Sequence, residues 1–197
     1  MPLKRAIDIV GSGLALLVGL PLLMAIAAAV AIDSGFPVLY RQRRVGRGFR
    51  QFHLLKFRSM VASEGGPRIT VSGDSRVTRV GRFLRATKLD ELPQFWNVLT
   101  GDISLVGPRP ELPEYVEMFR TRYQHILSVR PGITDIASIR FRDEEKLLAQ
   151  SPEPLREYAE RVLPLKLDLA DEYLNKRSLR FDLLILVKTL IVSLRTG

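Results

Sequence analysis

The sequence predicts an α+β fold, mainly helical, that is anchored to a membrane near its N-terminus. The first observation is an uncharged apolar segment, Ile9 to Ile32, which as a helix is long enough to cross a hydrocarbon core of about 30 Å. The second is a basic stretch divided by glycines, residues 40–60, whose pattern indicates a β-hairpin. The third is a pair of later helical patterns, one ending near Leu99 and one covering Leu183 to Leu194.

Composition limits the chemistry that the chain can perform. Its 197 residues suit one domain with a small appendage, and a hydrophobic content of 46% is enough for a core. The absence of cysteine excludes disulfides and thiolate metal sites. His53 and His125 are the only histidines, which are too few for a typical zinc site. A metal would therefore be held by carboxylates, which favours Mg²⁺ or Mn²⁺. The net charge of +9 indicates anionic lipid or a phosphorylated substrate as partner, because no aromatic-basic pattern supports nucleic acid.

The N-terminal apolar segment has three interpretations. The first is a cleaved signal peptide, because Ala29-Val30-Ala31 is similar to a cleavage site. Against it, the apolar run is longer than a signal core and the region after it is strongly basic. The second is a straight transmembrane helix, and the third is a helix that enters and leaves through the same leaflet.

Charge and a central proline bear on the last two interpretations. Lys4 and Arg5 precede the segment and five arginines from Arg41 to Arg50 follow it, so the positive-inside rule would keep both flanks in the cytoplasm. Pro21 lies mid-segment, where it removes a backbone hydrogen bond and bends a helix. A re-entrant helix-break-helix fits these features, but a spanning helix stays open because proline is tolerated in membrane helices.

The basic stretch that follows is expected to supply phosphate contacts. Gly46 and Gly48 mark the turn of the hairpin. Lys56 and Arg58 are two residues apart, on the same face of a strand. Both are candidate phosphate-binding residues, and the alternative interpretation is a basic collar against lipid headgroups.

Asp90 and Glu91 form an adjacent pair of carboxylates. Thr87 or Asp90 can cap a helix that runs to about Leu99 and is closed by Gly101. Adjacent helical positions point in different directions, so the pair suits two roles: a nucleophile or metal ligand, and an acid, base or orienting group. The simpler alternative is that both carboxylates only mark the start of a helix.

Arg109 lies between Pro108 and Pro110. The prolines fix the backbone, so the guanidinium is preorganised for a two-pronged phosphate contact. The alternative is a stiff loop without a binding role.

The tail segment is apolar, but Lys188 interrupts it and it is short for a membrane span. We expect a helix that lies in the membrane interface with Arg180, Lys188 and Arg195 toward the headgroups, and the alternative is a buried core helix. The chain would then have three parts: a membrane helix hairpin at 1–35, a cytoplasmic domain at 36–180 and an interfacial amphipathic helix at 181–197.

Several segments resemble the bacterial sugar transferase family. In chain order they are QRRVGRGFRQFHLLKFRSM, LRATKLDELPQFWNVLTGDISLVGPRPE and VRPGIT, and the tail DEYLNKRSLRFDLLILVKTL is similar to the family's closing pattern. Members are monotopic phosphoglycosyl transferases that begin glycoconjugate assembly on polyprenyl phosphate. The resemblance implies a re-entrant membrane helix and a small catalytic domain at the cytoplasmic face of the bacterial inner membrane.

The resemblance also implies a reaction and residue roles. Asp90 would take a sugar-1-phosphate from a UDP-sugar, forming a phosphoryl-aspartate and releasing UMP, before undecaprenyl phosphate attacks. Glu91 would be its partner, Mg²⁺ would bridge Asp90 and the pyrophosphate, and phosphate would be bound by Lys56, Arg85 and Arg109. The product would start exopolysaccharide or lipopolysaccharide synthesis, while the sugar and a homodimeric state stay open.

The chain departs from the family pattern in two places. Leu20-Pro21 stands where members often have Ser-Pro, which keeps the proline effect but removes a hydroxyl. Residues 135–142 replace a glycine followed by a Gln-Val-Asn-Gly-Arg run, and we expect this segment to help select the sugar or nucleotide. An ion pair between Asp135 and Arg142 is the alternative.

Two other functions stay open at this stage. The chain could be a membrane-tethered, non-catalytic scaffold of a polysaccharide-assembly complex, although the intact Asp90–Glu91 pair argues against a degenerate site. It could also be a glycosyl transferase proper, which would release UDP instead of UMP. The nucleotide that leaves separates the two enzymatic hypotheses.

Overall fold

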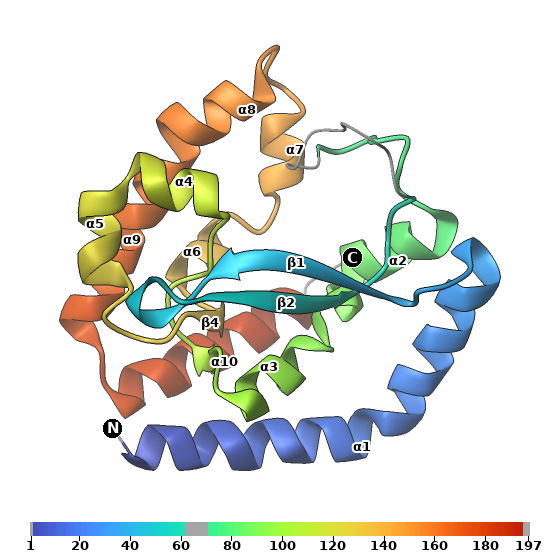
Figure 1. The fold of residues 1–197 in the computed structure, drawn as a ribbon, viewed down its shortest axis with the longest axis horizontal. Helices are drawn as coiled ribbons and strands as arrows, with labels where there is room; N and C mark the ends of the chain where they lie inside the picture. The colour runs from blue at the N-terminus through green and yellow to red at the C-terminus, as the bar shows by residue number, and fades with distance from the viewer. Residues whose placement is uncertain (1, 62–70, 195–197) are drawn as a thin grey trace.

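The computed structural model describes residues 2–61 and 71–194, and in these ranges the protein is mainly helical with two small sheets (Figure 1). This confirms the prediction of a mixed, mainly helical fold. The strands are β1 (Leu39–Val45), β2 (Gln51–Phe57), β3 (Ser104–Val106) and β4 (Gly132–Thr134). The α-helices are α1 (Pro2–Ser34), α2 (Arg79–Thr87), α3 (Gln94–Thr100), α4 (Pro113–Met118), α5 (Arg120–Ile126), α6 (Ile136–Arg140), α7 (Glu144–Leu148), α8 (Pro154–Glu157), α9 (Leu163–Lys176) and α10 (Leu179–Leu194). Two 3₁₀ turns, η1 (Arg47–Phe49) and η2 (Leu89–Glu91), and a π-helical turn, η3 (Tyr158–Val162), complete the described elements.

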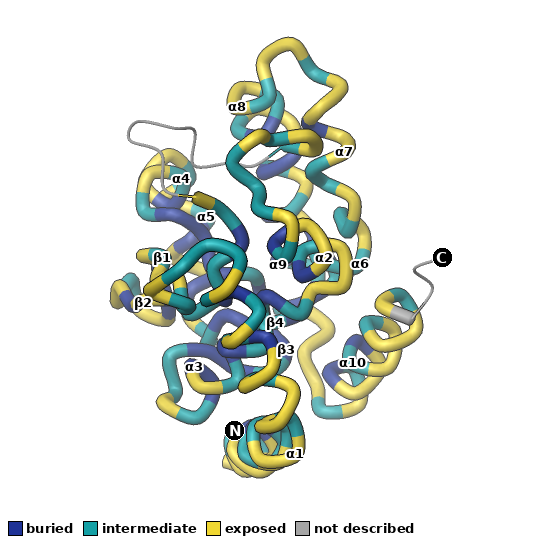
Figure 2. The backbone as a smooth tube through the Cα atoms, turned by 90° about the vertical axis from the view of Figure 1, so that its right-hand side faces the viewer, coloured by how far each residue is buried: buried dark blue, intermediate teal, exposed yellow. Residues whose placement is uncertain are grey.

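Helix α1 is one helix of 33 residues with Pro21 inside it. In Figure 1 it runs along the lower edge of the molecule and then turns up the side toward β1, the kind of bend that an internal proline produces. The structure therefore shows a bent helix, and it does not confirm the break that the helix-break-helix prediction requires. By length and composition α1 can cross a membrane, and few of its apolar side chains are buried (Figure 2).

Polar contacts fix the first turns of α1 to the rest of the protein. The Asp8 carboxylate accepts hydrogen bonds from Ser104 Oγ at 2.8 Å and from the Leu105 amide at 3.1 Å. Lys4 Nζ donates to Val106 O at 2.9 Å and to Asp182 Oδ2 at 2.5 Å. The start of α1 is thus tied both to β3, which leads into the Pro-Arg-Pro loop, and to α10.

Strands β1 and β2 form the predicted antiparallel hairpin around the glycine turn. On one face of β2, Phe52 and Leu54 are buried against Val98 and Ile103. Lys56 continues the same two-residue alternation, so it lies where this apolar cluster ends. The hairpin therefore carries Lys56 on a strand whose face is fixed by core packing.

Strands β3 and β4 pair in parallel and bring the Pro-Arg-Pro loop beside the chain that follows β4. Two glycines permit this approach: a Cβ on Gly132 would lie 2.1 Å from the Gly107 nitrogen, and one on Gly107 would lie 2.5 Å from Arg130 O. The Gly107 amide donates to Thr134 O and the Gly132 amide to Pro108 O. A larger residue at either position would force the two segments apart.

Residues 87–99 do not form the single helix that the sequence predicted. Lys88 adopts a left-handed conformation with φ of 59°, which ends α2 at Thr87, and Asp90 then lies in the 3₁₀ turn η2. Helix α3 begins only at Gln94, and Gly101 closes it in the left-handed conformation as predicted. The prediction that Thr87 or Asp90 caps this helix is wrong, because η2 and Pro93 separate both residues from α3.

Helix α10 combines features of both predictions for the tail. Ile185 is buried against Val106 and Tyr173, whereas Leu183 and Leu190 are 62% and 64% exposed. The helix therefore has a core contact and an exposed apolar surface. Three basic residues were expected to face headgroups. Arg180 and Lys188 are exposed, and Arg195 lies outside the described residues. The division of the chain into parts at residues 35 and 180 stays a prediction.

Candidate active site

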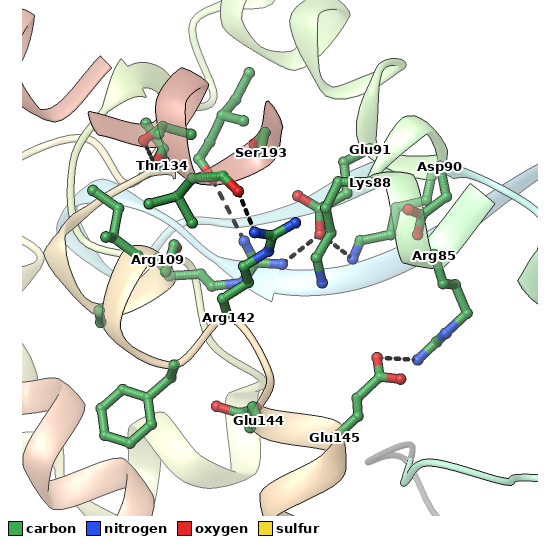
Figure 3. A pocket seen from close by; sticks show the side chains of 18 of the residues that line it. Arg85, Lys88, Asp90, Glu91, Arg109, Thr134, Arg142, Glu144, Glu145 and Ser193 are labelled. Carbon is green, nitrogen blue, oxygen red and sulfur yellow. Dashed lines mark hydrogen bonds and ion pairs between the residues drawn. The ribbon is translucent and has the colours of Figure 1, made fainter. Parts of the chain in front are cut away.

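A pocket of about 310 Å³ lies between η2, the loop after β3, α6, α7 and the end of α10. Figure 3 shows side chains around this space, and its labelled residues include Arg85 of α2 and Thr134 of β4 besides residues of the elements just named. The pocket brings together residues that are up to 53 positions apart in the sequence and that were predicted to form the site: Lys56, Arg85, Asp90, Glu91 and Arg109.

The Glu91 carboxylate is held between two cations. Its Oε1 accepts from Lys56 Nζ at 3.0 Å and from Arg109 Nη2 at 2.6 Å. Burial alone would raise the pKa of Glu91, but the attraction and hydrogen bonds of Arg109 and Lys56 outweigh burial and hold the pKa well below its ordinary value. Glu91 is therefore an anion at neutral pH, and it fixes the positions of both cations.

Asp90 is only 5% exposed. Burial raises its pKa, because the attraction of Lys56 does not compensate for lost hydration and Glu91 adds repulsion. Asp90 Oδ1 has no hydrogen-bond partner among the described residues, a state that is rare for a buried carboxylate oxygen. That oxygen can accept a cation or attack an electrophile without first giving up a protein hydrogen bond.

Lys56 and Arg109 respond differently to the same anion. Burial lowers the pKa of Lys56, and Glu91 only partly restores it, while Arg109 lowers it further. The attraction of Glu91 raises the pKa of Arg109 above its ordinary value despite burial. Arg109 is thus the permanent cation of the site, and Glu91 counteracts the lowered pKa of Lys56.

Two further ion pairs form the side of the pocket at α7. Arg85 Nη2 lies 2.5 Å from Glu145 Oε1, and Lys166 Nζ pairs with Glu144. Arg85 is therefore in the pocket as predicted, but a phosphate there would have to replace or share its contact with Glu145.

Besides Lys166, the structure adds two pocket cations that the sequence did not predict as phosphate-binding residues, Lys88 and Arg142. Lys88 lies two residues before Asp90 in the sequence, and its charge counteracts the raised pKa of Asp90. Arg142 lines the pocket and donates a hydrogen bond to the carbonyl oxygen of Val192 on α10. The position of Lys88 two residues before Asp90 was an available signal. Arg142 lies in the 135–142 segment that was expected to help select the substrate, but no local pattern reveals its contact with α10.

Arg58 lies outside this pocket, although the sequence predicted a phosphate-binding role for it. Strand β2 ends at Phe57, so the alternation that placed Arg58 beside Lys56 does not continue. Instead its guanidinium donates to the carbonyl oxygens of Ser34 and Gly35 at the end of α1. Pro21, the predicted helix break, lies in the interior of α1 and not at the end of the helix that Arg58 contacts.

The alternative ion pair between Asp135 and Arg142 is wrong. Asp135 is 2% exposed, and its carboxylate caps α6 by accepting from the Ser138 amide at 2.7 Å. Arg142 instead contacts α10. Part of the 135–142 segment nevertheless lines the pocket, namely Ala137, Ser138, Ile139, Phe141 and Arg142. Its predicted influence on substrate choice stays a prediction.

A magnesium ion fits this site only with help from a substrate. The described residues contain no group of three histidine, cysteine or acidic side chains that could hold a metal. The partnerless Oδ1 of Asp90 offers one ligand position, and Mg²⁺ in phosphate-handling sites is commonly held by one or two carboxylates together with phosphate and water.

Comparison with known proteins gives a family match and several relatives. A family model described as bacterial sugar transferase matches residues 1–196. The UDP-glucose:undecaprenyl-phosphate glucose-1-phosphate transferase of Caulobacter vibrioides is 44% identical over 142 residues, which are 70% of this chain and 53% of the relative. The transferase of the same name from Escherichia coli K12 is 42% identical over 193 residues, 95% of this chain and 39% of the relative.

A shorter relative is matched over most of its length. The putative undecaprenyl-phosphate N-acetylgalactosaminyl 1-phosphate transferase of Bacillus subtilis is 41% identical over 122 residues, 61% of this chain and 68% of the relative. By contrast, the chain matches only 53% and 39% of the two longer relatives.

Proposed function

The chain belongs to the bacterial sugar transferase family, and on that basis we propose that it transfers a sugar-1-phosphate from a UDP-sugar to undecaprenyl phosphate and releases UMP. The names of its relatives contain this reaction or this acceptor. The observation that carries the proposal is the buried, partnerless oxygen of Asp90 beside Glu91, which holds Lys56 and Arg109. Phosphoryl transfer needs little more from a protein than positioning and neutralisation of charge.

In the first step the Asp90 carboxylate attacks the phosphorus that carries the sugar. A bond forms between an Asp90 oxygen and this phosphorus, the bond from phosphorus to the UMP oxygen breaks, and UMP leaves with the electron pair. No proton has to move, because the nucleophile and the leaving phosphate are both anionic oxygens. The burial of Asp90 supports this role, since a poorly hydrated carboxylate loses little solvation when it attacks.

Lys56 and Arg109 act on the negative charge of the transferred phosphoryl group. Glu91 holds both cations in place before the substrate binds, so little reorganisation is needed in the transition state. The planar guanidinium of Arg109 can donate two parallel hydrogen bonds to phosphate oxygens. Lys88, close to Asp90, adds a third positive charge on the side of the nucleophile.

In the second step a phosphate oxygen of undecaprenyl phosphate attacks the same phosphorus. The bond to Asp90 breaks, the carboxylate is regenerated, and the product is a polyprenyl diphosphate that carries the sugar. Asp90 is the residue that would hold Mg²⁺, and the ion would supply additional neutralisation of phosphate charge. Glu91 keeps Arg109 and Lys56 in place through both steps.

The membrane arrangement belongs to the same proposal. Helix α1 would enter and leave the cytoplasmic leaflet of the bacterial inner membrane, with both basic flanks in the cytoplasm. The bend of α1 and the exposed apolar side chains of α1 and α10 support a protein that lies on one face of the membrane. The pocket would then meet the acceptor phosphate while the polyprenyl tail stays in lipid.

The test is to incubate the full chain with a panel of UDP-sugars and Mg²⁺ without acceptor. We expect UMP in a ratio of about one per enzyme with the correct donor, and a mass increase of one sugar-phosphate on the peptide that contains Asp90. Adding undecaprenyl phosphate should remove the adduct and restart UMP release. Release of UDP would support a glycosyl transferase proper, and no nucleotide release with any donor would contradict the proposal.

A further inference from the structure

Asp135 uses its two carboxylate oxygens for two different parts of the pocket. Oδ1 accepts from the Ser138 amide at 2.7 Å and from Ser138 Oγ at 2.6 Å, which holds the first turn of α6. Oδ2 accepts from the Arg109 amide at 3.1 Å. The side chain is nearly inaccessible to solvent, so water cannot readily replace these hydrogen bonds.

The bond to the Arg109 amide controls the loop that carries the permanent cation of the site. Proline has no N–H group, so within Pro108-Arg109-Pro110 the Arg109 amide is the one backbone donor available. Asp135 accepts it. The guanidinium at the other end of the same residue donates to Glu91 Oε1 at 2.6 Å, so Arg109 is held at its backbone by one carboxylate and at its side chain by another.

From this arrangement we infer that Asp135 is a positioning residue for Arg109, which couples the phosphate-binding loop to the pocket wall at α6. This inference rests on the proposed function, because it assigns Arg109 to the donor pyrophosphate. Asp135 is not among the residues that line this pocket; it sets the distance and orientation of Arg109 relative to the start of α6, where Ala137 and Ser138 line the pocket. Loss of Asp135 leaves the Glu91 pair intact but lets the loop move relative to α6.

Three substitutions separate this role from helix capping. Asp135→Ser keeps one oxygen that can cap α6 by accepting from the Ser138 amide, but its single short hydroxyl cannot also hold Arg109. Asp135→Ala removes both functions, and Asp135→Asn keeps the size but has one acceptor oxygen for two sites. Glu153→Ser is the matched control, because Glu153 is an exposed acidic residue at the N-terminal cap of α8, outside the pocket.

The measurements are UDP affinity by calorimetry, kcat/KM for the UDP-sugar and the thermal unfolding midpoint. We expect Asp135→Ser and Asp135→Ala to weaken UDP binding and to lower kcat/KM by about 10- to 100-fold, as small misplacements of a binding group do. Asp135→Ser should keep a midpoint close to that of the unsubstituted protein, whereas Asp135→Ala should not. Asp135→Asn should fall between the unsubstituted protein and Asp135→Ala in UDP affinity, and Glu153→Ser should change none of the three.

The outcome for Asp135→Ser decides the inference. If this variant binds UDP and turns over the donor as the unsubstituted protein does, Asp135 acts only as a helix cap and the inference is overturned. The same holds if Asp135→Ala leaves UDP affinity unchanged. Failure of the proposed function is a separate result: the unsubstituted protein would release no UMP, while the calorimetric comparison of the variants would still test the tether.

Discussion

Asp90 and Glu91 are neighbours in the sequence, yet their surroundings shift their pKa values in opposite directions. Burial raises the pKa of Asp90, with Lys56 too weak to compensate. Arg109 and Lys56 overcome the same effect at Glu91 and hold its pKa well below the ordinary value. Pairs of carboxylates separated in this way usually have different roles, and here the destabilised anion is the candidate nucleophile while the stabilised one orients the cations.

The first prediction concerns Asp90→Asn. The amide has nearly the same volume but is a poor nucleophile, so UMP release should fall by about 10³-fold or more, as for other nucleophile deletions. The adduct seen by mass spectrometry should disappear. Because the substitution removes a buried carboxylate whose charge is costly, the thermal unfolding midpoint at pH 7 should be unchanged or higher. Asp74→Asn, at an ion pair with Arg76 outside the pocket, is a control that should retain UMP release. Turnover by Asp90→Asn near the unsubstituted rate would contradict the mechanism.

The second prediction is the pH dependence of the first half-reaction. Attack requires ionised Asp90, so donor kcat/KM should decline on acidification at a higher pH than an ordinary aspartate would give. The effect of pH on stability has the opposite sign. Because the folded-state pKa of Asp90 is raised, protonated Asp90 stabilises the folded protein. This contribution is fully present below the unfolded-state pKa and is lost as pH rises through the folded-state pKa. Glu91 contributes stability above its unfolded pKa, which is lost only when pH falls through its depressed folded pKa.

Comparing unfolding midpoints across pH checks these signs. The difference in midpoint between Asp90→Asn and the unsubstituted protein should be largest near neutral pH and should shrink in acid, where Asp90 becomes protonated. A difference that grows in acid would show that the environment of Asp90 favours its charged form.

At the scale of elements, local patterns predicted what local forces determine. Alternation and a glycine turn located the β1–β2 hairpin, and Gly101 marked the end of α3. The start of α3 could not be predicted, because Lys88 takes a left-handed conformation that ends α2 and opens a separate turn for Asp90. Lysine has no intrinsic preference for that conformation, so tertiary packing imposes it.

The pocket residues likewise divide into those that the sequence identified and those that depend on tertiary contacts. The resemblance and residue chemistry identified Lys56, Asp90, Glu91 and Arg109, which the structure brings together. Arg142 and the tether at Asp135 depend on contacts with distant segments, and no periodicity of the local sequence encodes them.

The third prediction tests the close approach of β3 and β4. In Gly132→Ala the new methyl group would lie 2.1 Å from the Gly107 nitrogen, so backbone must shift at a cost of about 2 kcal/mol or more. The free energy of unfolding should fall by this amount, and UDP binding should weaken because the Arg109 loop moves with β3. Gly19→Ala in α1, where a Cβ would meet nothing within 4 Å, should not destabilise the protein in denaturant unfolding, because alanine favours a helix over glycine. It should leave UDP calorimetry unchanged. Equal behaviour of the two variants would exclude a tight β3–β4 contact.

The fourth prediction concerns the exposed apolar surface of α10. Leu183 and Leu190 are the most exposed apolar side chains of this surface. Replacing both with aspartate should reduce the fraction of protein that floats with anionic vesicles, since apolar burial and lipid attraction both decrease. UMP release in detergent should stay within about twofold, because exposed substitutions away from special features change stability little. Replacing the exposed Leu155 of α8 with aspartate is the control. Unchanged flotation of the α10 variant would leave membrane attachment to α1 alone.

At the scale of the whole molecule, the contacts of α1 with the folded body restrict how this helix can lie in a membrane. Its first turns bind β3 and α10 through Asp8 and Lys4, and its last turn receives hydrogen bonds from Arg58 at the end of β2. The two ends of one bent helix are therefore held by the same folded body (Figure 1). A helix that spanned the bilayer would have to release one of these ends, because the folded body cannot lie on both sides.

The last prediction follows from this geometry. The sequence contains no cysteine, so single cysteines introduced at Pro2 and at Gly48 report their locations without background. If α1 is re-entrant, both should be labelled only from the cytoplasm by a membrane-impermeant thiol reagent. Labelling of the Pro2 position from the periplasm would establish a span. Pro21→Ala restores a backbone donor and should straighten α1, which would strain the contacts of Lys4 or Arg58. We therefore expect this variant to show partial periplasmic labelling at Pro2 together with a lower unfolding midpoint, because a straight helix cannot keep both ends bound to the same body.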